Sequence, residues 1–166
     1  MSDVTLRTAT ADDAQGLVAL MKGVAIEGRW IRTQWPFDEA ERVERFSGTI
    51  GGGLVLCIVA ERYGRIVGQI SLFPSDDVAE FGMFVEPSER ARGLGRRLMD
   101  AGEALARERG FVGMELEVYA HNEAAIALYR SAGFEEFGDR FPELRTSGEL
   151  YDVVRMRKAI AKSPKS

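Results

Sequence analysis

The stretch Phe84–Arg97, FVEPSERARGLGRR, decides the fold of this chain. It reads as the end of a strand, a turn at Pro87 and an arginine-rich, glycine-containing loop that leads into a helix from residue 94. Glycines let the backbone approach a ligand closely, and the free amides at a helix N-terminus favour a negative group. The stretch therefore predicts an anion-binding helix N-terminus suited to a pyrophosphate.

Two other phosphate-binding loops do not fit this stretch. A Walker loop needs GxxxxGK followed by Ser or Thr, and the chain contains no such run. A dinucleotide fingerprint needs GxGxxG after the first strand of its unit, but here Leu98 stands at the third glycine position and the loop follows the fourth predicted strand. The pyrophosphate belongs to some other cofactor.

Hydrophobic periodicity and turn residues outward from this loop predict an α/β protein. The predicted helices span 11–26, 38–50, 94–109 and 122–132, and the predicted strands span 4–8, 54–61, 66–73, 78–85, 113–120, 134–137 and 150–156. The order βααβββαβαββ implies a central sheet with helices packed on it. The segment 27–37 reads as irregular, and no helix or strand is predicted over 140–148.

The loop and a second motif together resemble the GNAT (Gcn5-related N-acetyltransferase) superfamily. Arg90–Gly95 matches R/Q-x-x-G-x-G/A, and residues 122–134, NEAAIALYRSAGF, are similar to the family's second motif almost letter for letter. The resemblance covers residues 54 to 157. It implies a mixed, mainly antiparallel sheet with a splayed pair of central parallel strands and helices on both faces, as a single domain over 1–160 with a polar tail at 161–166.

The same resemblance implies where acetyl-CoA, the acyl donor, binds. The strands 78–85 and 113–119 should splay, and the cofactor should lie between them. Main-chain groups near Met83, Phe84 and Val85 should pair with the pantetheine arm, and Asn122 should touch that arm or fix the local turn. The pyrophosphate should be held by backbone amides of the loop, which comprises Arg90, Ala91, Arg92, Gly93, Leu94, Gly95 and Arg96.

The implied chemistry is direct transfer of the acetyl group to an amine. A neutral amine attacks the thioester, and a strand amide near Phe84 or Val85 stabilises the oxyanion. Tyr129 matches the family's tyrosine near the cofactor sulfur and is the predicted general acid for the departing thiolate. Its alternative role is that of a helix aromatic packed on the sheet.

The general base is predicted to be Glu80, a carboxylate within an apolar strand that should line the cleft. A shift of register would turn it to the other face. Glu117 and Glu27 are rival carboxylates, and His121 titrates in a suitable range but reads more simply as a loop histidine beside a cap. Cys57 lies within an apolar strand and reads as a core residue.

The acceptor pocket is expected in the segment 27–37, with Glu27, Trp30 and Trp35 as its binding residues. Arg29 and Arg32 could pair with a substrate carboxylate, and 140–148 could form the opposite wall or a dimer edge. The favoured acceptor is the primary amine of a small molecule, either an amino acid or an amine-bearing toxin. The alternatives are a protein or peptide amine, and a non-catalytic acetyl-CoA sensor or interaction module.

Composition limits the remaining classes of function. The formal net charge of −4 makes general nucleic-acid binding a poor fit, and a single cysteine and a single histidine argue against a zinc site. No apolar run is long enough to span a bilayer, and residues 1–10 lack an apolar signal core. We therefore expect a cytoplasmic enzyme that uses no metal, binds neither nucleic acid nor membrane, and forms a homodimer only by analogy with the family.

Overall fold

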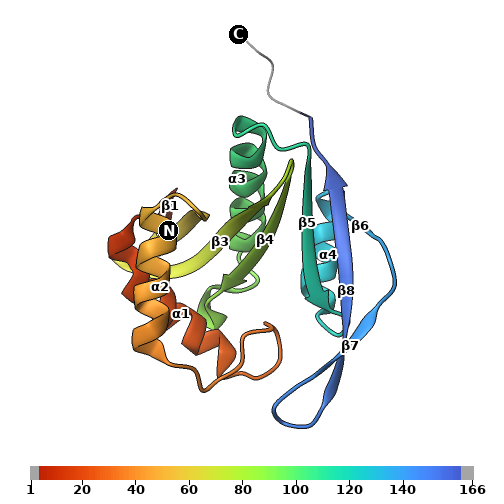
Figure 1. Ribbon diagram of the computed structural model, residues 1–166, viewed down its shortest axis with the longest axis horizontal. Helices are drawn as coiled ribbons and strands as arrows, with labels where there is room; N and C mark the ends of the chain where they lie inside the picture. Colours follow the sequence, from red (N-terminus) through yellow and green to blue (C-terminus); the bar gives the residue numbers. More distant parts are fainter. Residues whose placement is uncertain (1–3, 162–166) are drawn as a thin grey trace.

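The computed structural model describes residues 4–161 and confirms the expected order of elements, with one strand in addition (Figure 1). The predicted tail lies outside the described residues from 162 onward. Two short 3₁₀ turns lie at Ala11–Asp13 and Pro87–Glu89. The helices are α1 Ala14–Ala25, α2 Glu39–Gly51, α3 Leu94–Glu108 and α4 Glu123–Ser131. The strands are β1 Thr5–Thr8, β2 Leu56–Arg62, β3 Arg65–Ser75, β4 Val78–Val85, β5 Gly113–Tyr119, β6 Glu135–Glu136, β7 Phe141–Leu144 and β8 Leu150–Ala159.

All strands join one sheet in the order β1-β2-β3-β4-β5-β8-β6, with β7 paired to β8. Only β4 and β5 run parallel, and they share just three residue pairs, from Val78 opposite Gly113 to Glu80 opposite Glu115. Beyond Glu80 the two strands diverge, as Figure 1 shows for the ends of β4 and β5 that lie away from the C-terminus. The expected splayed pair is therefore confirmed.

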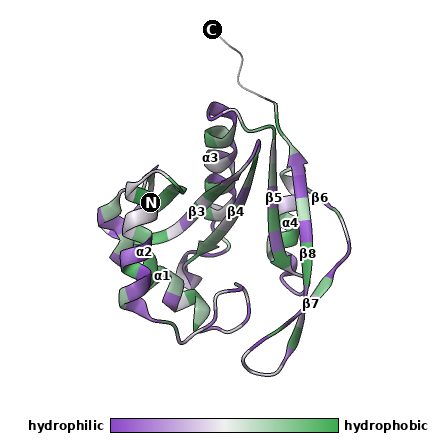
Figure 2. Ribbon diagram, viewed as in Figure 1, coloured by the Kyte–Doolittle hydropathy of each residue, from purple (hydrophilic) through white to green (hydrophobic). Residues whose placement is uncertain are grey.

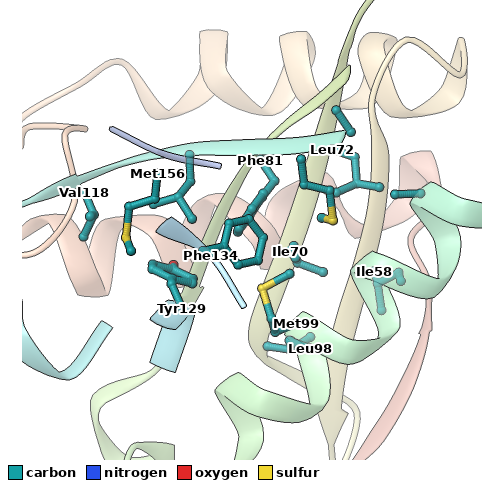
Figure 3. Close-up of a cluster of buried hydrophobic side chains, with 14 of the residues drawn as sticks. Ile58, Ile70, Leu72, Phe81, Leu98, Met99, Val118, Tyr129, Phe134 and Met156 are labelled. Carbon is teal, nitrogen blue, oxygen red and sulfur yellow. The ribbon is translucent and has the colours of Figure 1, made fainter. Parts of the chain in front are cut away.

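Two layers of helices cover the sheet. On one face, α3 and α4 enclose the larger core cluster, in which Phe81, Tyr129 and Phe134 gather with Leu98 and Met156 (Figure 3). On the other face, α1 and α2 cover a smaller cluster that includes Leu17, Val59 and Phe46. Figure 2 shows hydrophilic residues along much of α2, whose side chains are nowhere fully buried. Helix packing thus leaves the acidic face of β5 uncovered by α1 and α2.

The added strand, β7, falls in a segment for which the sequence predicted no helix or strand. Its sequence FPEL places Pro142 in the middle, and a proline cannot donate to a sheet ladder. The structure accommodates it because β7 pairs with β8 on one side only, at the edge of the sheet. The β7–β8 hairpin forms one wall beside the functional site.

Two helix glycines are expected to respond oppositely to alanine. A Cβ at Gly102 of α3 would lie 2.5 Å from Cδ1 of Ile70, whereas a Cβ at Gly23 of α1 would meet nothing within 4 Å. Gly102→Ala should therefore destabilise the protein by about 1–3 kcal/mol through overpacking. Gly23→Ala should stabilise it by roughly 0.5–1 kcal/mol through helix propensity. Urea unfolding of both variants checks this, and a shift of the same sign in both would contradict it.

Candidate active site

A single cleft of about 980 Å³ passes through the sheet where β4 and β5 splay. On the α3–α4 face it is lined by Gly95, Leu128 and Tyr129, and on the other face by strand residues that include Glu80 and Glu117. The cleft therefore has lining residues on both faces of the sheet.

The wall of the cleft formed by β4 offers main-chain groups to a ligand. From Gly82 to Val85 this strand is half-buried and stays paired with β3, but it has no partner residue in β5. Met83, Phe84 and Val85, the residues predicted to bind pantetheine, all line the cleft. An extended chain laid along this edge would meet unpaired backbone groups, as in strand addition.

The predicted pyrophosphate loop is held in a left-handed backbone conformation at two residues. Ala91 has φ 61° and Gly93, the N-cap of α3, has φ 81°. A Cβ at Gly95 would lie 3.2 Å from Leu128, so α3 begins close against α4. Just before the loop, the buried carboxylate of Glu89 accepts hydrogen bonds of 2.8 and 3.0 Å from Arg62, which lower the pKa of Glu89.

The arginines of this loop serve different purposes. Arg90 donates to Val85 O and to both oxygens of Glu27, so its side chain ties the loop to the end of α1. Arg96 binds Asp100 and Ser131. Arg90, Ala91, Gly93, Leu94 and Gly95 line the cleft, while Arg92 and Arg96 do not. The loop is thus placed to bind an anion through its backbone.

The predicted acid, Tyr129, is 6% exposed and lies within the core cluster. Its ring meets Phe81 and Phe134 edge-on, at centroid distances of 5.8 and 6.0 Å (Figure 3). Burial raises the pKa of Tyr129 above its ordinary value, so the hydroxyl keeps its proton at neutral pH. Within residues 4–161 this hydroxyl has no hydrogen-bond partner. Tyr129 therefore both packs in the core and lines the cleft.

Asn122 both caps a helix and lines the cleft. Its side-chain oxygen accepts from Ala125 N at 3.3 Å, which fixes the start of α4 and hence the position of Tyr129. His121, next to it, contacts Arg29 O at 2.7 Å and stacks on Tyr119 at 5.4 Å. His121 does not line the cleft and acts in packing.

Three carboxylates face the cleft from the side opposite α3 and α4. Glu80 is exposed on β4, directly opposite Glu115 in β5, and Glu117 follows two residues later on the splayed part of β5. Glu117 forms an ion pair with Arg32. In the described part of the chain, Glu80 and Glu115 form no ion pair within 4.0 Å. Glu80 is therefore a free carboxylate on the strand that lines the cleft.

The segment 28–34 is fastened to the far side of the cleft by a network that the sequence did not predict. We call it the latch; its members outside the segment are Tyr119, His121, Glu143, Arg145, Thr146 and Tyr151. Arg145 is 5% exposed and donates to Ile31 O at 3.0 Å, Arg32 O at 3.3 Å and the Tyr119 hydroxyl at 2.7 Å.

The Tyr119 hydroxyl in turn binds Glu143, and burial raises the pKa of Tyr119 to about 12. Arg32 bridges Glu143 and Glu117, which links the latch to the carboxylates of the cleft. Gln34 also accepts from Thr146 N at 2.7 Å. The β7–β8 hairpin is thus tied to the segment 28–34, but none of residues 140–148 lines the cleft.

Two of the three residues predicted to bind the acceptor do not line the cleft. Trp30 does, but Glu27 is held by Arg90 outside it, and Trp35 packs edge-on against Phe37 at 5.2 Å under the Lys22 ammonium. Both expectations assumed that the whole segment 27–37 faces the pocket, whereas only 30–33 does.

Other chemistries find no support in the described residues. Cys57 is buried, and burial raises the pKa of its thiol to about 11, so it is protonated at neutral pH. Residues 4–161 contain no cluster of three or more potential metal ligands. None of the helices described here is long and apolar enough to cross a membrane.

The site combines a splayed pair of parallel strands, a helix that begins at a glycine, and a buried tyrosine beside them. These are the features that the sequence predicted for an acyl-CoA-dependent transferase. Residues 25–134 match the model of the Acetyltransferase (GNAT) family. The chain belongs to this family and is an N-acetyltransferase.

Known relatives differ in their acceptors. The chain is 32% identical over 157 residues to the N-alpha-acetyltransferase RimI of Mycobacterium tuberculosis, covering 93% of this chain and 92% of the relative. It is 26% identical over 159 residues to the L-methionine sulfoximine/L-methionine sulfone acetyltransferase of Pseudomonas paraeruginosa, covering 92% of each. An acetyltransferase structure from Salmonella typhimurium with its cofactor acetyl-CoA shares the fold, with a TM-score of 0.82, 22% identity, and coverage of 99% and 98%.

Proposed function

We propose that the protein moves the acetyl group of acetyl-CoA directly to the primary amine of a small molecule, such as an amino acid or an amine-bearing toxin. The observation that carries this proposal is the cleft that crosses the sheet at the β4–β5 splay. It brings a donor on the Tyr129 side and an acceptor on the Glu80 side to the same edge of β4. The tied segment 28–34 bounds the acceptor side, which favours a small acceptor.

The donor would lie along β4, with pantetheine beside Met83, Phe84 and Val85 and its pyrophosphate on the amides at the start of α3. These amides point out of a helix of 15 residues whose dipole favours an anion at that end. This placement would bring the thioester to the free edge of β4, in the cleft that Tyr129 also lines.

The transfer itself needs three groups. The neutral amine forms a bond to the thioester carbon, and an amide of Phe84 or Val85 donates to the oxyanion that results. The carbon–sulfur bond then breaks, and the Tyr129 hydroxyl gives its proton to the departing thiolate. Because burial raises the pKa of Tyr129, the donor proton is present throughout the neutral range.

The proton of the incoming amine would pass to Glu80, directly or through water. Glu80 is exposed to the cleft and free of ion pairs in the described chain, whereas Glu117 is engaged by Arg32. A carboxylate held by a guanidinium is a weaker proton acceptor. Glu80 is therefore the better base of the two, and Glu117 is the alternative.

Glu80→Gln is expected to lower kcat/KM by about 100-fold at neutral pH, the typical contribution of a general base. The loss should shrink as the pH rises toward the pKa of the acceptor amine, because more of the amine is then already neutral. Glu135→Gln, at an exposed carboxylate of β6 that does not line the cleft, is the control and should change the rate little. An unchanged rate in Glu80→Gln, with a large loss in Glu117→Gln, would assign the base to Glu117 instead.

A thiol-release assay tests the function itself. Purified protein and acetyl-CoA are mixed with amino acids, polyamines, aminoglycosides and short peptides, and CoA release is followed for each. Turnover with a small amine supports the proposal. Binding of acetyl-CoA without turnover on any amine favours the alternative of a sensor or interaction module, and absence of binding would overturn the donor site.

A peptide or protein N-terminus is the second candidate acceptor. The 32% identity to a relative named as an N-alpha-acetyltransferase, over nearly the whole of both chains, favours it. Mass spectra of short peptides treated with protein and acetyl-CoA would show a gain of one acetyl group at the N-terminus. Peptide turnover that exceeds turnover of every small amine would replace the leading proposal with this one.

A further inference from the structure

Most charged side chains of the cleft are already neutralised by a neighbour. Of the four arginines that line it, Arg32 pairs with Glu117 and Glu143, Arg45 with Glu41, and Arg90 with Glu27. The fourth is Arg155 on β8, which forms no ion pair within 4.0 Å in the described part of the chain. It is the one cleft arginine with its charge available to a ligand.

The position of Arg155 is fixed by an aromatic ring. Its guanidinium stacks over Phe137 at 4.5 Å, and both residues line the cleft. Phe137 is held in place because its amide donates to Arg155 O at 2.9 Å. A guanidinium stacked on a ring keeps its hydrogen-bonding edge free for a planar anion such as a carboxylate.

Arg155 lies on the same face of the sheet as the free carboxylates, yet apart from them. It is directly opposite Glu117, and the neighbouring row of the sheet places Glu80 opposite Glu115 and Glu115 opposite Arg157. The cleft therefore holds the unpaired cation of Arg155 and the unpaired carboxylates of Glu80 and Glu115, and neither carboxylate forms an ion pair with Arg155. A ligand with an ammonium and a carboxylate would complement both.

We infer that Arg155, stacked on Phe137, binds a carboxylate of the acceptor, so that the protein selects free amino acids over amines whose carboxyl group is an amide. The inference rests on the proposed function, because it places the acceptor amine beside Glu80. It also separates the two candidate acceptors, since the N-terminal residue of a peptide has no free α-carboxylate.

The test compares acceptors that differ only in this group. Alanine, methionine, phenylalanine and glutamate are supplied as free acids and as α-carboxamides, and KM is measured by thiol release at saturating acetyl-CoA. Binding of the same compounds to the CoA-saturated protein is measured by calorimetry, which needs no turnover. Losing one charge-assisted contact should cost about 10- to 100-fold in affinity.

The matched control is Arg157, which stacks on the other side of Phe137 at 4.6 Å but does not line the cleft. Arg155→Gln should raise KM and Kd for the best free acid by about 10- to 100-fold and leave its carboxamide unchanged, by loss of one charge-assisted contact. Arg157→Gln should leave both unchanged. Arg155→Lys keeps the charge without the planar fork and should restore part of the affinity.

A carboxamide lowers the basicity of the neighbouring amine, so acids and amides differ in more than charge. The decisive quantity is therefore how far Arg155→Gln changes the ratio of KM, and the ratio of Kd, between each acid and its amide. An unchanged ratio, stronger binding of the amides by the unsubstituted protein, or no binding of any free acid would overturn the inference. Acids that bind in an Arg155-dependent way without releasing CoA would leave it standing and refute the proposed function. Turnover of the amides alone would refute the inference and leave the proposed function standing, whereas turnover of peptides alone would refute both.

Discussion

Replacing Tyr129 with Phe is expected to lower kcat by about 100-fold or more, the usual contribution of a general acid. The phenylalanine ring would keep the edge-on contacts with Phe81 and Phe134, so the fold should persist. Only the hydroxyl is lost, and within residues 4–161 that hydroxyl has no structural partner. A large rate loss would therefore report chemistry, because no described hydrogen bond disappears with it.

The measurement pairs thiol-release kinetics with calorimetry of acetyl-CoA binding. Kd for acetyl-CoA should change little, because the proposed binding groups for the cofactor are on β4 and at the start of α3. Tyr63→Phe, at a side chain 81% exposed in the β2–β3 turn, is the control and should be silent. A variant at Tyr129 that retains the full rate would contradict the acid role.

The same residue sets an expectation for pH dependence. Burial raises the pKa of Tyr129, so its protonated form, the one that acts as an acid, persists at and above pH 10. Loss of this proton therefore cannot lower kcat between pH 7 and 10. A rate that falls with rising pH in that range, in a manner abolished by Tyr129→Phe, would show an ordinary or lowered pKa.

Replacing Arg145 with Met is expected to lower the free energy of unfolding by about 2–4 kcal/mol, because its loss removes the donor from one buried and two partly buried acceptors. Those acceptors are two carbonyls of the segment 28–34 and the Tyr119 hydroxyl. The segment would lose its fastening to the β7–β8 hairpin. KM for the acceptor should therefore rise. Kd for acetyl-CoA, which we propose binds on the other side of the sheet, should stay the same.

Urea unfolding and acceptor kinetics measure the two effects separately. The control is Arg140→Met, which removes an arginine from the connection just before β7, breaks only its exposed pair with Glu136, and should change stability little. Equal destabilisation by both substitutions would show that the latch contributes nothing beyond a surface ion pair.

The fold was predictable because its decisive residues are local. The loop before α3 and the motif 122–134 are each one continuous stretch of sequence. An apolar run identified β4 and alternation identified β5, each to within a residue. The splay itself, however, follows from long-range pairing that stops at Glu80, and no local pattern shows where a ladder ends. Only the family resemblance predicted the splay.

The acceptor side was less predictable, because its residues come from distant parts of the chain. Arg145 and Arg155 read as ordinary surface arginines, since charged residues are seldom buried. Their roles depend on Tyr119, Ile31 and Phe137, each far away in sequence or on another strand. Nothing local distinguishes Trp30, which reaches the cleft, from Trp35, which packs on Phe37.

The short ladder of three residue pairs between β4 and β5 also affects the stability of the folded enzyme. The sheet consists of two halves that meet over a short ladder, and the donor would occupy the gap between them. A ligand that binds only the folded state stabilises it in proportion to the logarithm of its concentration. The lifetime of the folded enzyme would then follow the supply of acetyl-CoA, and a cell short of the donor would hold a more easily unfolded and degraded catalyst.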